Sequence, residues 1–189
     1  MSERNPYAPP TTDVSPVQSE AIAAPPIEPP FFATSLLKLG VMSLFTLGLY
    51  ELYWFYKNWQ LIKRREKLDV MPFWRAFFAV FFCYSCFSHV RRYEHPAVAA
   101  GSLAAGPLAA GWIVLNVSWR LPDPYWLITF FAFLPMLPVQ HRINEINNAV
   151  APGHDPNTRF TWLNWTGVAI GGVILALNMI GFLYFPEPA

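Results

Sequence analysis

The sequence has few charged residues. Only 13% of its 189 residues are Asp, Glu, Lys or Arg, whereas a soluble domain usually carries about 25%. The charges also cluster, since four of the twelve acids precede residue 31 and five of the thirteen basic residues lie between Lys57 and Lys67. The net charge of +1 and the lack of a basic face with interleaved aromatics give no indication of nucleic-acid binding.

Cysteine and cofactor motifs are also scarce. The two cysteines, Cys83 and Cys86, lie within one apolar run and form no disulfide framework. With His89 they would still need a fourth ligand to hold a metal ion, so we expect them to pack as small apolar side chains. The sequence contains no Walker loop, dinucleotide fingerprint, G-x-S-x-G or HExxH motif. We therefore expect no cofactor, no metal site and no catalytic residues.

Long apolar runs make up most of what is present. Hydrophobic residues account for 54% of the chain and aromatic residues for 17%. A helix needs about 20 apolar residues to cross a bilayer, and runs that are apolar on all sides favour helices over a barrel. The sequence predicts an all-α, polytopic membrane helix bundle spanning 31–189. Its five segments are expected at about 31–56, 73–90, 97–119, 124–140 and 160–185.

The first 30 residues differ from the rest. Pro, Ser, Thr and Ala dominate them, and such a composition cannot bury enough apolar surface to offset the entropy of ordering. We expect a disordered Pro-rich tail. The tail lacks a charged region followed by an apolar core, so we expect no cleavable signal peptide.

The side of the membrane on which this tail lies stays open. The region from Lys57 to Arg75 carries six basic residues and should be cytoplasmic. Five full spans would then place the tail outside, together with several later arginines, against the same rule. Alternatively, the first segment breaks at Thr46-Leu47-Gly48 into a re-entrant hairpin, which would keep the tail in the cytoplasm.

Two features suggest how the helices pack. Gly101 and Ala105 lie four residues apart in the third segment, as do Gly167 and Gly171 in the fifth. Small residues at this spacing let membrane helices approach closely. We expect the third and fifth segments to pack together within the chain or to form a dimer face.

Several polar residues interrupt the apolar runs. Glu51 is an acid within an apolar stretch, where an ionisable residue is costly and suggests a function; a position near the interface would be an ordinary alternative. Asn116, Gln140 and Asn144 place amides in or beside other segments. These amides can bond neighbouring helices, or they can line a polar cavity together with Glu51.

One motif resembles a known family. Residues 46–57, TLGLYELYWFYK, resemble the T-x-G-[IL]-Y-x-x-Y-W-x-Y-[KR] signature of small bacterial inner-membrane proteins grouped as domains of unknown function. Residues 5–10, NPYAPP, also look like the start of many such proteins. The resemblance implies a protein of the bacterial inner membrane and supplies no activity; the multi-pass arrangement is expected from the apolar segments.

Three functional hypotheses follow. The first is a non-enzymatic membrane protein whose partners are the lipid bilayer and either a second copy or another membrane protein. The second is a small transporter or channel-like subunit with an amide-lined polar cavity. The third is a membrane enzyme acting on lipid, for which His141 and Glu145 are the best titratable pair, although pairs at this spacing on a helix are usually structural.

Overall fold

The computed structural model describes residues 28–98 and 101–184, and every regular element in these residues is helical. This confirms the all-α class. Most of the predicted disordered tail lies outside the described residues. The elements are α1 (Leu36–Phe45), α2 (Leu49–Glu66), α3 (Pro72–Phe77), α4 (Ala79–Arg91), α5 (Ala105–Val117), the 3-10 helices η1 (Ser118–Arg120) and η2 (Tyr125–Phe131), α6 (Met136–Val150) and α7 (Trp162–Tyr184).

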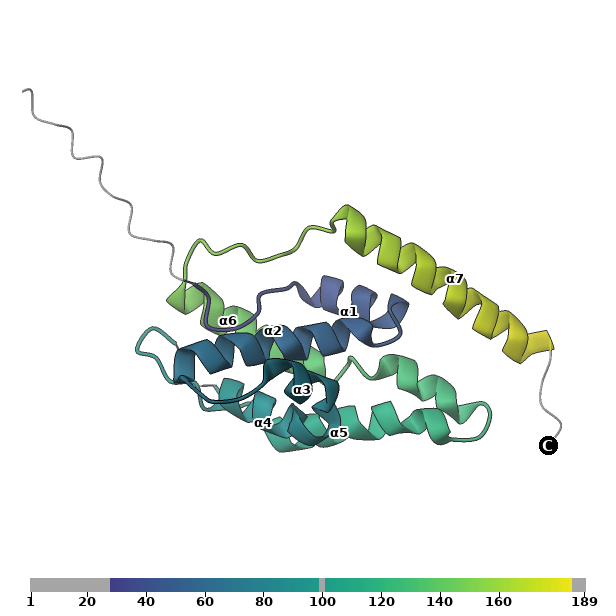
Figure 1. Ribbon diagram of the computed structural model, residues 1–189, viewed down its shortest axis with the longest axis horizontal. Helices are drawn as coiled ribbons and strands as arrows, with labels where there is room; N and C mark the ends of the chain where they lie inside the picture. Colours follow the sequence, from purple (N-terminus) through teal and green to yellow (C-terminus); the bar gives the residue numbers. More distant parts are fainter. Residues whose placement is uncertain (1–27, 99–100, 185–189) are drawn as a thin grey trace, which may run out of the picture.

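The first predicted segment is a helical hairpin and not one helix. The chain reverses between α1 and α2 at Leu47 and Gly48, whose φ angles are 52° and 84° (Figure 1). Glycine adopts this left-handed conformation without the steric penalty of a Cβ. The Thr46 hydroxyl supports the turn, because it donates to the carbonyl of Met42 and accepts from the backbone N–H of Tyr50. The break lies where the alternative interpretation placed it.

The three middle segments contain shorter helices than predicted. The second divides into α3 and α4 at Phe78, and the third is helical only from Ala105. The fourth divides into η2 and α6, and α6 continues ten residues beyond the predicted end at 140. None of these helices reaches the roughly 20 residues that a straight crossing needs. By length and composition, only α7 could cross a membrane, among the helices described.

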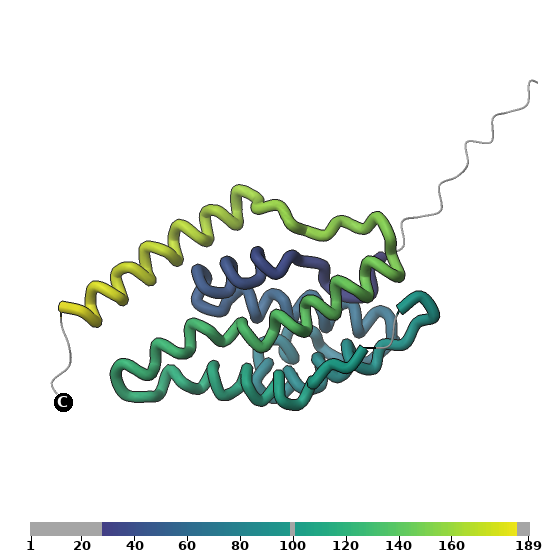
Figure 2. Tube along the Cα trace, turned by 180° about the vertical axis from the view of Figure 1, so that it is seen from behind, coloured from purple at the N-terminus to yellow at the C-terminus, as the bar shows by residue number. Residues whose placement is uncertain are grey.

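The hairpins give the molecule two distinct ends. In Figures 1 and 2 the α1–α2 turn and the η1–η2 turn lie toward one end, to which α7 also runs. A ring contact between Trp126 and Phe182, with centroids 6.2 Å apart, joins η2 to α7 there. The opposite end contains the C-termini of α2 and α6 and the chain near residue 28.

Aromatic side chains of α2 form the centre of the core. Trp54 and Phe55 are fully buried, and each packs against Phe87 of α4 with ring centroids 6.2 and 6.0 Å apart. Phe55 also meets the edge of Trp112 on α5 at 5.0 Å. Such pairs add to the large apolar area that each ring buries. The core therefore fixes α4 and α5 around the middle of α2.

Helix α7 joins the bundle through α1. A Cβ placed on Gly171 would lie 1.4 Å from the carbonyl oxygen of Phe45, and one placed on Gly167 would contact Thr46 and Met42. Only glycine permits so close an approach of two backbones. The third segment was predicted to pack on the fifth. In the structure α7, from the fifth segment, packs on α1, and α5, from the third, packs on α4.

Candidate functional site

A short non-helical segment, residues 31–34, lies within the bundle. Phe31 and Thr34 are fully buried, although no helix includes them. The backbone N–H and C=O groups of a buried segment without regular structure must find hydrogen-bond partners elsewhere. The side chains around residues 31–34 supply those partners.

Five amide side chains bond this backbone or each other, and one of them, Asn157, donates from Nδ2 to the Ala33 carbonyl at 3.1 Å. Asn147 binds Phe31 on both sides, since its Nδ2 donates to the Phe31 carbonyl at 2.9 Å and its Oδ1 accepts from the Phe31 N–H at 3.2 Å. Asn58 Oδ1 accepts from the N–H of Phe32 at 3.1 Å. Asn144 Nδ2 donates to the Thr34 carbonyl at 3.0 Å. We call Asn58, Gln140, Asn144 and Asn147 the amide cluster.

Gln140 connects the amide cluster to the aromatic core. Its Nε2 donates to the Phe32 carbonyl at 3.2 Å and to Asn144 Oδ1 at 2.8 Å, and its Oε1 accepts from the indole N–H of Trp54. The side chain is fully buried. Both ends of the Gln140 amide are thus used in holding the fold, as buried polar groups generally are.

Glu51 lies in a second polar region, in the first turn of α2. The residue is 3% exposed, and its Oε2 accepts from the Trp112 indole N–H at 2.7 Å. Asn116 lines the same cavity as Glu51, and its Nδ2 donates to the Trp112 carbonyl at 3.0 Å. Helix α5 therefore places one donor on the Glu51 carboxylate and an amide one turn further along.

A cavity of about 120 Å³ borders Glu51. We call it the Glu51 cavity; its walls are Ser43, Leu47, Gly48, Glu51, Asn116, Thr129, Phe130 and Ala132. The Ser43 hydroxyl is buried and has no hydrogen-bond partner. The cavity therefore combines one carboxylate, one amide and two hydroxyl groups with space beside them.

Comparison with protein-family models, curated proteins and solved structures gives no match to this chain.

The four residues predicted to line one polar cavity fall into two groups. Glu51 and Asn116 border the Glu51 cavity, whereas Gln140 and Asn144 belong to the amide cluster. Sequence reasoning missed Ser43, Thr129 and Trp112, because one hydroxyl or indole in an apolar run carries no distinctive signal. The structure does not bring Gln140 and Asn144 to the Glu51 cavity.

The residues predicted to mediate helix packing also separate. Gly167 and Gly171 face α1, and Ala105 is fully buried in the core. Gly101 lies against the guanidinium of Arg142, which would be 2.7 Å from a Cβ at that position. Gly101 is therefore a site of close contact between a loop and α6.

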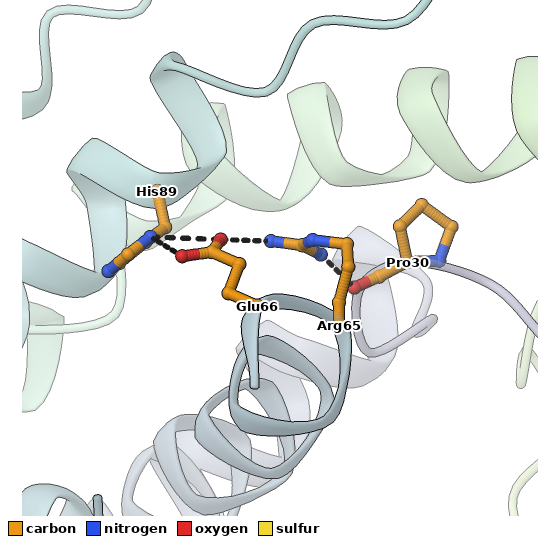
Figure 3. A network of polar contacts seen from close by, with 4 residues as sticks. All are labelled: Pro30, Arg65, Glu66 and His89. Atoms are coloured by element: carbon orange, nitrogen blue, oxygen red, sulfur yellow. Dashed lines mark hydrogen bonds and ion pairs between the residues drawn. The ribbon is translucent and has the colours of Figure 1, made fainter. Parts of the chain in front are cut away.

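The Cys-x-x-Cys motif is part of the core. Cys83 and Cys86 are fully buried and free. His89 points instead to Glu66, with Nδ1 and Oε2 3.0 Å apart, and Glu66 also pairs with Arg65 (Figure 3). Within 28–98 and 101–184, no three His, Cys, Asp or Glu side chains are arranged to hold a metal ion.

Arg65 links this pair to the start of the described chain. Its guanidinium donates to the Pro30 carbonyl at 2.7 Å and lies 4.5 Å from the centroid of the Phe31 ring (Figure 3). The contacts of His89, Glu66 and Arg65 therefore join α4 and the end of α2 to the chain at residues 30 and 31.

Proposed function

We propose that the chain is an integral protein of the bacterial inner membrane that acts non-enzymatically, through association of its helices. The observation that carries the proposal is the exposure of large apolar side chains. They include Leu49, Phe81, Val114 and Trp119, which are 68%, 78%, 65% and 62% exposed. Exposed apolar surface of this extent is typical of contact with lipid or with another protein.

Helix α7 supports the membrane location most directly. It has 23 residues, about 34 Å at 1.5 Å per residue, and only Gly171 is buried. Trp162 and Trp165 lie at its start and Tyr184 at its end, as interfacial aromatics do. Lipid chains would cover the apolar side chains that the bundle leaves exposed.

The distribution of basic residues supports insertion from one side. Arg64, Arg65 and Lys57 border the hollows beside residues 28–30, and Arg91 borders another next to Arg142. Between residues 93 and 141 the only Lys or Arg is Arg120, at the η1–η2 turn. If the hairpins enter the bilayer with their turns first, the end of the molecule that carries these basic residues remains in the cytoplasm. The later arginines then no longer lie outside, where the positive-inside rule disfavours them.

We assign the association to the outer face of α7 and to a second copy of the chain. Gly167 and Gly171 already face α1, which removes them from a dimer face. Ala169 and Ala176 are exposed and lie two turns apart on another face, so that a second α7 could approach there. A cysteine at Ala176 should cross-link two copies in membranes, whereas one at Leu163 should not.

The membrane arrangement is tested by labelling single cysteines in a Cys83→Ala, Cys86→Ala background. Cysteines that replace Glu28, Glu94 and Asp155 should each react only when the reagent reaches the cytoplasmic side. A cysteine that replaces Asp123 should not react with reagent on that side. The protein should also stay in the membrane after alkaline carbonate washing. Release by carbonate, or labelling of the first three positions on different sides, would overturn the proposal.

A further inference from the structure

The Glu51 carboxylate has no basic partner among the described residues. The group that donates to it is the neutral Trp112 indole, and no Lys, Arg or His lines the Glu51 cavity. Removing an ionised carboxylate from water costs several kcal/mol unless an opposite charge or sufficient hydrogen bonding compensates. The surroundings of Glu51 therefore determine whether its charge can be kept.

Two features of those surroundings stabilise a negative charge, although burial opposes one. Glu51 lies in the first turn of α2, where the N-terminal end of the helix dipole stabilises a negative charge. The Trp112 N–H adds a hydrogen bond to the carboxylate, and donation to a charged acceptor is stronger than donation to a neutral one. The charge is thus supported but not neutralised.

The adjacent cavity provides oxygen ligands for a positive ion. Ser43 and Thr129, which each carry a hydroxyl, line the cavity, and Ser43 is 3% exposed with an unused hydroxyl. Because Asn116 donates through its nitrogen, its amide oxygen remains an acceptor. A buried polar atom without a partner needs an explanation, and a ligand in the cavity would supply the missing contact.

We propose that the Glu51 cavity binds a small monovalent cation, with the Glu51 carboxylate as counter-ion and the Ser43, Thr129 and Asn116 oxygens as ligands. A single carboxylate balances one positive charge, whereas divalent ions are usually held by several carboxylates. A volume of about 120 Å³ exceeds the roughly 30 Å³ that one water molecule occupies in the liquid, so there is room for an ion with a water molecule. The proposal does not depend on which way the protein lies in the membrane.

The test is a titration of the purified full-length chain in detergent. Sodium, potassium or ammonium chloride replaces N-methylglucamine chloride at constant ionic strength, and the midpoint of thermal unfolding is followed. We expect the midpoint to rise and saturate with at least one of the three small cations. For sodium, the NMR linewidth of the ion should broaden and should narrow again when a competing ion is added.

Two variants separate the cavity from general salt effects. Glu51→Gln keeps an acceptor for Trp112 but removes the charge, and it should weaken cation binding at least tenfold. Glu145→Gln removes an exposed acid on α6 and should titrate like the wild type. If Glu51→Gln does not fold, Ser43→Ala and Thr129→Val replace it, each with an expected severalfold loss of affinity.

Three outcomes would overturn the proposal. One is that the unfolding midpoint of the wild type responds equally to the small cations and to N-methylglucamine, which would indicate ionic screening only. Another is that no cation has a saturable effect. The third is that the variants with altered cavity residues titrate like the wild type. None of these results would affect the membrane arrangement, which the labelling and carbonate experiments test separately.

Discussion

The bundle contains two polar regions that differ in how completely their groups are paired. In the amide cluster, both ends of Gln140 and of Asn147 are hydrogen-bonded. At the Glu51 cavity, the Ser43 hydroxyl is unpaired and there is open space beside the carboxylate. A paired network specifies one arrangement of the chain, whereas unpaired groups around a space are suited to a ligand. The amides therefore serve the fold, and Glu51 is the better candidate for function.

Gln140→Met should show the largest effect, because it removes a side chain that bonds three partners. The Trp54 N–H, the Phe32 carbonyl and Asn144 would all lose a contact. An unpaired buried group costs about 1–3 kcal/mol, so the free energy of unfolding should fall by about 4 kcal/mol. Denaturant unfolding in detergent would measure this, and a loss below about 1 kcal/mol would contradict the structural role of the amide cluster.

Asn147→Leu should have the next largest effect. It leaves both the N–H and the C=O of Phe31 without their side-chain partner, at an expected cost of about 2–3 kcal/mol. Asn148→Leu is the matched control, since Asn148 is exposed on the same helix and its replacement should change stability by less than about 0.5 kcal/mol. Equal effects of the two substitutions would remove the distinction between paired and solvated amides.

Gly48→Ala tests the turn that positions Glu51 beside its cavity. Because Gly48 has a φ angle of 84°, an alanine there must adopt the left-handed backbone conformation, which costs about 1–2 kcal/mol. The unfolding midpoint should drop accordingly, and the affinity for the cation should fall with it. Gly181→Ala is the control, because nothing lies within 4 Å of a Cβ there, and alanine in that helix should be neutral or stabilising.

Ser43→Ala should have the smallest effect on stability. The hydroxyl has no partner to lose, so the free energy of unfolding should change by less than about 0.5 kcal/mol. Ser118→Ala offers the contrast, since the Ser118 hydroxyl donates to the Val114 carbonyl at 2.8 Å, and its loss should cost about 1 kcal/mol. A large loss on Ser43→Ala in salt-free buffer would show that the hydroxyl already has a structural role.

The sequence anticipated parts of this structure well. Continuous apolar runs without alternation predicted helices, and α7 begins two residues after the predicted start of the fifth segment and extends almost to its predicted end. The break at Thr46-Leu47-Gly48 could be foreseen because glycine and a polar residue interrupt an apolar run. The expectation of five separate crossings was less successful, because composition reveals how apolar a run is and not where it turns back.

Composition and local pattern by themselves determined that the described chain is helical, that one long helix is apolar throughout, and that the basic residues gather in a few places. Only the tertiary structure decided which polar groups pair. Gln140 bonds Phe32, and Asn147 bonds Phe31, across separations of 108 and 116 residues, which no local periodicity encodes. The same holds for the Glu51 cavity, because its walls come from α1, α2, α5 and η2 and exist only once those elements have packed together.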